Sequence, residues 1–337
     1  MARRRDLEIR IDSIFPSAAI PGGQIMVRGS GMAAEPGDQP EVSFGEARGR
    51  LIFGGPERIL VTVPSEVEDD EFRITAGKAT SAPVPFALGR QLADDVHPVA
   101  NPAIDPDGNV YTTQSGPRGK KTPVSVYKIA RDGGTMSAFL SGIVNPTGLL
   151  FHPDGTLLVS SRHEGTVYAV DPKGEMEVFA EGMGIATGLA MDREENVYVG
   201  DRTGTVFKIS RDRKIYVFAT LESSVAAYHL AAGTDGNLFV SAPTTSSFDA
   251  IRQIDSEGSV TVWRRGFGRP QGIAFDASDR LHLCASYRGQ RGIFRLGEDG
   301  GAELVVSGQG IVGLAFEPEG GLVVATGNSL YRIPQLS

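Results

Sequence analysis

The sequence is poor in cysteine: Cys284 is the single one among 337 residues. A disulfide needs two thiols and a cysteine-based zinc site needs several, so neither can form within one chain. Cys284 lies in an apolar run. That setting is typical of a buried small side chain rather than of a nucleophile.

Long apolar stretches are missing as well. No segment approaches the roughly 20 consecutive apolar residues that a membrane-spanning helix requires. The start, "MARRRDLEIRIDSIFP", carries an arginine cluster without the apolar core of a secretion signal. We therefore expect no membrane partner and a cytoplasmic location. An extracytoplasmic location stays open for the case that a signal peptide has been removed.

An excess of basic residues is also lacking. The chain has 33 Lys and Arg residues against 41 Asp and Glu residues, a formal net charge of −8. A general nucleic-acid binder needs a basic face, so we expect no nucleic-acid partner. The sequence also has no Gly-x-Ser-x-Gly elbow and no phosphate-binding loop, which argues against a serine hydrolase and an NTPase.

Glycine and proline are plentiful, with 43 and 20 residues, which favours many tight turns over long helices. The stretch "GLAMDREENVYVGDRTGTVFKI", residues 188–209, has two alternating apolar runs around a turn and predicts a β-hairpin. Similar stretches recur about every 40 residues. The six copies begin at Asn101, Gly148, Gly188, His229, Gly272 and Gly313.

Each of the first five copies is followed by two further apolar runs, which gives four short strands per repeat. This pattern predicts the blades of a six-bladed β-propeller. The sixth repeat has no fourth strand, because only four residues follow Ile333. An open blade would expose strand edges, so we expect the segment 84–97 to supply the missing strand. Which part of that segment does so stays open.

Residues 7–88 do not share the repeat and alternate short apolar runs with Pro/Gly turns, which predicts a small β-sandwich. The segment has the start Ser13-Ile14-x-Pro16-Ser17, the turn Pro21-Gly22-Gly23, Gly29-Ser30-Gly31 and the ending Ser81-Ala82-Pro83-Val84-x-Phe86. With these residues it resembles the immunoglobulin-like IPT/TIG domain. The predicted class is therefore all-β, with an Ig-like sandwich at 7–88 followed by a propeller at 89–337. The sandwich would position a partner or mediate oligomerisation.

The six repeats resemble the NHL-repeat and SMP-30/gluconolactonase-like propellers. The resemblance implies a ligand site at the mouth of the central channel. In the lactonase branch, acidic and amide side chains just before the repeat glycine hold a divalent cation. Here those positions hold no carboxylate, and the nearby amides Asn101 and Asn145 make a poor substitute. The six positions are Ala100, Thr147, Thr187, Tyr228, Gln271 and Val312. We therefore expect no metal and no cofactor.

His229 replaces the repeat glycine of the fourth unit. Lyase-type propellers that open cyclic peptide lactones use channel histidines with a glutamate, and "YHLAAGTDGNLF" is similar to their repeat. A single histidine without a glutamate is not a catalytic constellation, so the favoured interpretation is a hydrogen bond within the channel wall. A catalytic role for His229 stays open.

The loops between second and third strands carry arginines from four repeats. These arginines are Arg118, Arg162, Arg202, Arg288 and Arg291. On one rim they would bind a carboxylate, a phosphate or an acidic peptide. Alternatively, each arginine pairs with an acid such as Glu164, Asp201 or Asp249 and ties adjacent blades together.

Two functions follow from these observations. The favoured one is a binding module for an anionic small molecule or an acidic protein segment; the alternative is a lactonase- or lyase-like enzyme with an altered site. Whether the protein is an enzyme stays open. The candidate ligand-binding residues are Asn101, Asn145, Arg162, Thr187, Asp201, Arg202, Tyr228, His229, Gln271, Arg288 and Arg291.

Overall fold

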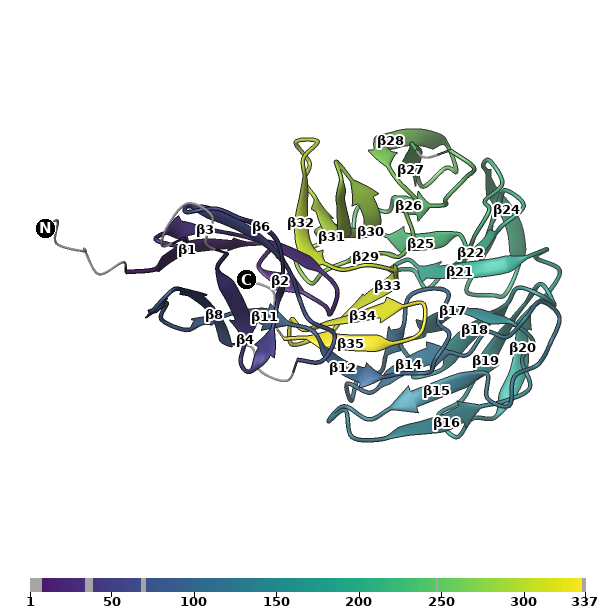
Figure 1. The fold of residues 1–337 in the computed structure, drawn as a ribbon. Coiled ribbons are helices and arrows are strands. Elements are labelled where there is room, and N and C mark those ends of the chain that lie inside the picture. Colours follow the sequence, from purple (N-terminus) through teal and green to yellow (C-terminus); the bar gives the residue numbers. More distant parts are fainter. Residues whose placement is uncertain (1–7, 34–38, 68–70, 247, 335–337) are drawn as a thin grey trace, which may run out of the picture. The chain divides into compact units, whose positions relative to one another are not determined.

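The computed structural model describes residues 8–33, 39–67, 71–246 and 248–334. All regular secondary structure in these residues is β-strand (Figure 1), so the predicted all-β class is confirmed. None of the described residues forms a helix that is long and apolar enough to cross a membrane. The expected domain limits at residues 7 and 337 lie outside the described residues.

The chain forms two compact units. The first unit contains residues 1–90, 304–309 and 333–337, and the second contains residues 91–303 and 310–332. Each unit has its own sheets and is described by itself.

The first unit contains two sheets that share one hydrophobic core. The first has the order β1 (Arg10–Phe15), β3 (Gln24–Ser30), β7 (Arg58–Thr62) and β6 (Arg50–Gly54). The second has the order β10 (Val84–Pro85), β8 (Glu71–Ala76), β4 (Glu41–Phe44) and β5 (Ala47–Arg48), and β9 (Ala79–Thr80) pairs with β8.

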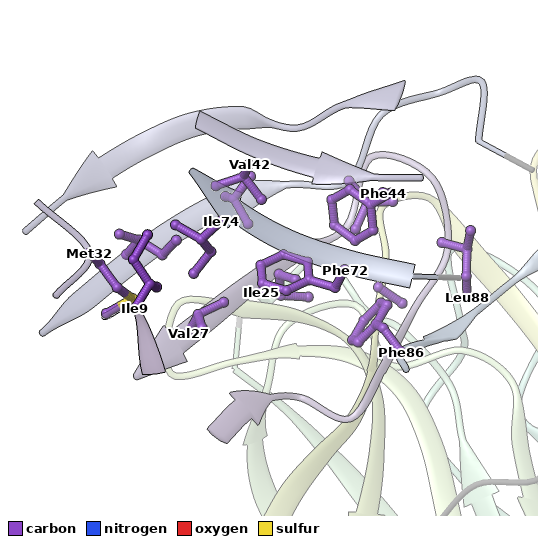
Figure 2. Close-up of a cluster of buried hydrophobic side chains, with 14 of the residues drawn as sticks. Ile9, Ile25, Val27, Met32, Val42, Phe44, Phe72, Ile74, Phe86 and Leu88 are labelled. Carbon is purple, nitrogen blue, oxygen red and sulfur yellow. The ribbon is translucent and has the colours of Figure 1, made fainter. Parts of the chain in front are cut away.

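Alternating burial explains this core. Every second residue of β3, β4 and β8 is buried, which is the period of a strand with one face turned inward. In Figure 2 the side chains of Val27, Phe44 and Ile74 point into the same cluster. The rings of Phe44 and Phe72 meet edge to face with centroids 5.3 Å apart. In the same unit, β2 (Ala18–Ala19) pairs in parallel with β11 (Ala87–Leu88) and with the end of β32 (Ala302–Ser307).

The propeller is built from six sets of four strands, counted over the described residues. The first three blades are β13 (Ala103–Ile104), β14 (Val110–Thr113), β15 (Val126–Ile129) and β16 (Met136–Leu140); β17 (Pro146–Phe151), β18 (Leu157–Ser161), β19 (Thr166–Val170) and β20 (Met176–Ala180); and β21 (Ala186–Met191), β22 (Val197–Asp201), β23 (Thr205–Ile209) and β24 (Ile215–Thr220).

The remaining blades follow the same order along the chain. They are β25 (His229–Ala232), β26 (Leu238–Ser241), β27 (Asp249–Ile254) and β28 (Val260–Phe267); β29 (Ile273–Phe275), β30 (Leu281–Tyr287), β31 (Gln290–Leu296) and β32; and β33 (Ile311–Phe316), β34 (Leu322–Thr326), β35 (Leu330–Ile333) and β12 (Arg90–Ala93).

The sixth blade is completed by β12, which pairs with β35 beside β34 and β33 (Figure 1). The prediction that a strand from 84–97 closes this blade is therefore confirmed, and the strand is Arg90–Ala93. A hydrophobic cluster spans this junction. Val96 follows β12 and packs with Val110 and Ile129 of the first blade and with Val323 and Leu330 of the sixth. Closure thus joins the sixth blade to the first.

Burial falls from the second strand to the fourth in every blade except the fifth, where four of the six residues of β32 are buried. All five residues of β18 and of β22 are buried, whereas the fourth strands β20 and β24 begin with three exposed residues. The repeat glycine belongs to the closely packed inner strands. A Cβ at Gly188 would lie 2.2 Å from the carbonyl oxygen of Tyr228, and a Cβ at Gly148 would lie 2.4 Å from that of Thr187. These positions need glycine because the next blade's backbone approaches so closely.

The aspartates in the turns between first and second strands hold those turns through hydrogen bonds. The Asp105 carboxylate accepts hydrogen bonds from the Asn109 amide at 2.8 Å and from the Tyr111 hydroxyl at 3.1 Å. Asp192 occupies the same position in the third blade and accepts from Asn196 and Tyr198. Turn chemistry therefore accounts for these aspartates.

Candidate functional site

A cavity of about 480 Å³ lies among the loops of the first three blades, and we call it the arginine cavity. Arg118, Arg162 and Arg202 come from the loops between second and third strands of successive blades. The loops that enter the next inner strands complete the wall. They contribute Asn145, Gly184, Ile185, Ser223 and Ser224.

The guanidinium groups of Arg118 and Arg202 both lie close enough to that of Arg162 to repel it. The half-buried Arg162 has a pKa below the ordinary arginine value, first because burial disfavours its charge and then because Arg202 and Arg118 repel it. Arg202 donates from Nε to the Ser224 carbonyl oxygen at 3.1 Å. In the part of the chain that the structure describes, none of the three arginines forms an ion pair with an acid.

The acids that could have paired with these arginines are bound elsewhere. The buried Asp201 carboxylate accepts from the backbone amides of Ile185, at 3.0 Å, and Thr203, at 2.9 Å. Glu164 accepts from the Tyr168 hydroxyl at 3.0 Å, and Asp249 accepts from Thr244. Inter-blade ion pairing therefore does not explain these arginines within the described residues.

Asn145 holds the loop that carries Arg118. Its amide Nδ2 donates to the carbonyl oxygens of Gly116 at 2.8 Å and Pro117 at 3.1 Å, while its Oδ1 accepts from the Gly119 amide at 2.7 Å. Asn145 itself is buried and has a positive φ of 50°, a conformation that asparagine tolerates better than most residues. The predicted ligand residue Asn145 is thus a positioning residue of the cavity wall.

We expect Asn145→Ala to lower the free energy of unfolding by about 1–3 kcal/mol, because the loop loses its three hydrogen bonds to Asn145. Chemical denaturation measures this change. Limited proteolysis should also cut the loop at residues 116–121 faster than in the wild type. Unchanged stability together with unchanged cleavage would contradict the positioning role.

The other polar candidates on the inner strands are engaged in joining blades. Thr187 accepts from the Tyr228 amide at 3.0 Å and donates to the Gly200 carbonyl oxygen at 2.8 Å. Asn101 donates to the Ile273 carbonyl oxygen at 3.0 Å and accepts from the Leu314 amide at 3.2 Å, so it ties the first blade to the fifth and sixth. The Gln271 backbone pairs with Cys284 and Ser241.

Two further candidates, Arg288 and Arg291, do not line the arginine cavity. Both are exposed on the hairpin formed by β30 and β31, Arg288 in its turn and Arg291 in β31. The Arg288 guanidinium lies 5.1 Å from the centre of the Tyr287 ring. The buried Tyr228 donates from its hydroxyl to the Glu222 carbonyl oxygen, and burial is the main cause that raises its pKa to about 12. Tyr228 lines a different cavity, in the fourth blade.

His229 lies in the wall of the central channel, in a cavity of about 420 Å³ whose other lining residues mostly have apolar side chains. Its Nε2 is buried and has no hydrogen-bond partner among the described residues. The hydrogen bond that we expected His229 to form within the channel wall is therefore missing at Nε2. Burial lowers the pKa of His229 to about 4. The imidazole is therefore neutral at pH 7.

Because two histidines are buried, we expect the free energy of unfolding to fall in acid. Burial is the main cause that lowers the folded-state pKa of His229 and of His282 to about 4, from an ordinary value of 6.5. Between these values the unfolded chain binds protons that the folded chain does not, so unfolding becomes more favourable as the pH falls from about 6.5 towards 4. Each unit of pKa shift corresponds to about 1.4 kcal/mol.

Urea unfolding at a series of pH values measures this effect, and His229→Asn should reduce the slope between pH 6.5 and 4. Aspartates with lowered pKa values, such as Asp276, contribute chiefly below about pH 5, so the part of the window above pH 5 reports on the histidines. A wild-type stability that is constant from pH 7 to 4 would contradict the prediction.

In the described residues, no three His, Cys, Asp or Glu side chains are grouped as they would be around a metal ion. The sequence also missed residues that the loops bring to the arginine cavity, namely His163, Ser223 and Ser224. His163 follows Arg162 in the loop between β18 and β19, and the sequence signal of Ser223 and Ser224 is a position in the loop before the inner strand β25. The candidates that the cavity does bring together are Asn145, Arg162 and Arg202, with Arg118 beside them.

No family model matches the sequence, and no curated protein matches it. Solved structures do resemble this chain. An auxiliary nutrient binding protein from Bacteroides ovatus is 12% identical, with 97% of this chain and 98% of that chain covered and a TM-score of 0.54. A gluconolactonase from Xanthomonas campestris is 17% identical, with coverage of 73% and 89% and a TM-score of 0.57.

Virginiamycin B lyase from Staphylococcus aureus is 14% identical, with coverage of 72% of this chain and 97% of that chain and a TM-score of 0.51. At such identities a likeness establishes the fold and leaves the activity open. The comparisons therefore support a β-propeller, in agreement with the sheet order.

Proposed function

We propose that this protein is a propeller-based binding module whose arginine cavity takes a small anionic ligand. The observation that carries the proposal is the convergence of Arg118, Arg162 and Arg202 on one cavity without an acidic partner among the described residues. Because like charges held together are unfavourable, this arrangement gains most from a bound anion.

Arginine suits this role because it stays charged and offers donors in a planar fork. That fork matches the oxygens of a carboxylate or a phosphate, and such charge-assisted hydrogen bonds are about twice as strong as neutral ones. The volume of about 480 Å³ falls in the range of small-molecule sites. We therefore favour a small carboxylate or phosphate compound over an acidic protein segment.

The N-terminal unit completes the proposal. Two sheets around one core support an IPT/TIG-like, immunoglobulin-type domain at residues 7–88, followed by the propeller at 89–337. In this proposal the domain positions a partner or mediates self-association. Sedimentation velocity of the full chain tests the self-association part, and a concentration-independent monomer would exclude it.

An enzyme of the lactonase or lyase type is the second candidate. It is favoured by the unpartnered Nε2 of His229 in the channel and by the likeness to a gluconolactonase and a lyase. A lactonase assay with added Ca²⁺ or Zn²⁺ tests it. Activity that is silenced by EDTA and by His229→Asn would support the enzyme, and no turnover would leave the binding module as the better proposal.

Isothermal titration of the full chain with inorganic phosphate, sulfate and citrate tests the proposed function. We expect saturable binding of at least one of these anions that weakens as NaCl is raised, because salt screens the arginines. A neutral analogue of matched size, glycerol, serves as the control. If none of the anions binds at low salt, the proposal is wrong.

A further inference from the structure

A second cavity, of about 570 Å³, lies in the fourth blade beside the loop that joins β26 to β27. We call it the blade-four cavity. It shares Ser223 with the arginine cavity but has none of the three arginines that define that site. The two cavities therefore offer different chemistry on neighbouring blades.

A buried carboxylate without a full set of partners lies in this cavity wall. Asp249 is 3% exposed, and its Oδ1 accepts from the Thr244 hydroxyl at 2.7 Å and the Thr244 amide at 3.1 Å. Its Oδ2 is buried and has no hydrogen-bond partner among the described residues. An ionised carboxylate oxygen can only accept, so a hydrogen-bond donor would complete this group.

The charged residues that line the cavity argue against an ionic ligand. Asp249 and Glu222 are acidic, whereas Arg252 and Arg265 are basic, so the formal charges of the lining cancel. Arg252 already contacts Glu222 at 3.3 Å. A free ammonium ion or an anion would meet groups of both signs, and neither is favoured over the other.

The rest of the lining suits a neutral molecule with many hydroxyl groups. Ser223, Thr245 and Ser246 add hydroxyls that both donate and accept. Phe248 lines the same cavity and is 69% exposed, which leaves an apolar ring face free for the C–H face of a sugar ring. Hydroxyl donors and a flat C–H face together are the features of a carbohydrate.

We propose that the blade-four cavity binds a neutral carbohydrate, with Asp249 accepting hydrogen bonds from its hydroxyls and Phe248 stacking on its ring. This inference is independent of the proposed anion site, because it uses none of the residues of the arginine cavity except the shared Ser223.

Saturation-transfer NMR and titration calorimetry of the full chain with a panel of neutral mono- and disaccharides test the inference. We expect at least one sugar to bind, with an affinity that is insensitive to NaCl. Asp249→Asn keeps an oxygen that can accept from Thr244, but it puts an NH₂ group in place of Oδ2. That group cannot accept a hydrogen bond from a sugar hydroxyl, so the variant should bind sugar about tenfold or more weakly. Phe248→Ala should weaken it as well, and since this ring is exposed the variant should fold normally.

Two matched variants keep the result specific. Tyr216→Ala removes another exposed ring, on β24 outside the cavity, and should leave sugar binding unchanged. Arg162→Ala should also leave it unchanged, which separates this site from the anion site. If no sugar of the panel binds, if tetramethylammonium or sulfate competes with the sugar, or if Phe248→Ala binds sugar as the wild type does, the inference is wrong.

Discussion

Arg162→Ala is expected to weaken phosphate or citrate binding by about tenfold to a hundredfold while leaving the folded protein no less stable. Hydrogen bonds to charged groups contribute about 1.5–3 kcal/mol each, which sets the size of the loss. Stability is not expected to fall, because Arg162 is repelled by Arg202 and Arg118 and forms no ion pair with any described residue. Replacing Arg162 by alanine removes the repulsion that it experiences from Arg202 and Arg118 in the folded protein.

Arg288→Ala is the matched control, because Arg288 is an exposed arginine of the same propeller that does not line the cavity. Calorimetric titration measures the affinity of each variant, and thermal unfolding measures its stability. Arg162→Lys keeps the charge but loses the planar fork, so it should retain part of the affinity. A large fall in Tm for Arg162→Ala without a change in affinity would make this arginine a structural tie and contradict the proposal.

Leu330→Ala is expected to lower the free energy of unfolding by about 2–5 kcal/mol, the usual cost of a cavity at a fully buried leucine. Leu330 is 0% exposed on β35, the strand that pairs with the closing strand β12. It packs in the cluster that joins the sixth blade to the first. Truncating the Leu330 side chain therefore weakens both the sixth blade and the closure of the ring.

Urea unfolding measures this change, and Val178→Ala is the control. Val178 is an aliphatic residue on the outer strand β20 with 50% of its surface exposed, so its truncation should change stability by less than about 0.5 kcal/mol. If Leu330→Ala were as mild as Val178→Ala, ring closure through β12 would not support the fold. If Leu330→Ala does not fold at all, Leu330→Met tests the same position with a smaller change of volume.

The fold could be predicted well from the sequence, because its signals are local and repeated. The hairpin within 188–209 recurs as the second and third strands of each blade, and Gly188, on the first strand, marks the close approach of the next blade. The missing strand after Ile333 also predicted a donor near the start of the propeller, and β12 supplies it. Alternation of apolar residues and turn chemistry act over a few residues, so they can be seen in sequence alone.

The site could be predicted only in part, because side-chain direction depends on contacts between distant loops. The sequence placed five arginines in equivalent loops, but the structure brings only Arg118, Arg162 and Arg202 into one cavity. Asn145 decides where Arg118 lies, through hydrogen bonds to a loop 26 to 29 residues away. Asp201, which the spacing made a partner for arginine, instead binds backbone amides of its own loops.

By itself, the sequence determined the all-β class, the six repeats and the need for a closing strand, since each follows from local strand and turn patterns. Only the tertiary structure decided which charges remain unpaired. Ion pairs and buried acceptors depend on distances of a few ångströms between side chains from different blades, as for Arg162 and for the Oδ2 of Asp249. Those distances are set by packing of whole blades, which no local pattern encodes.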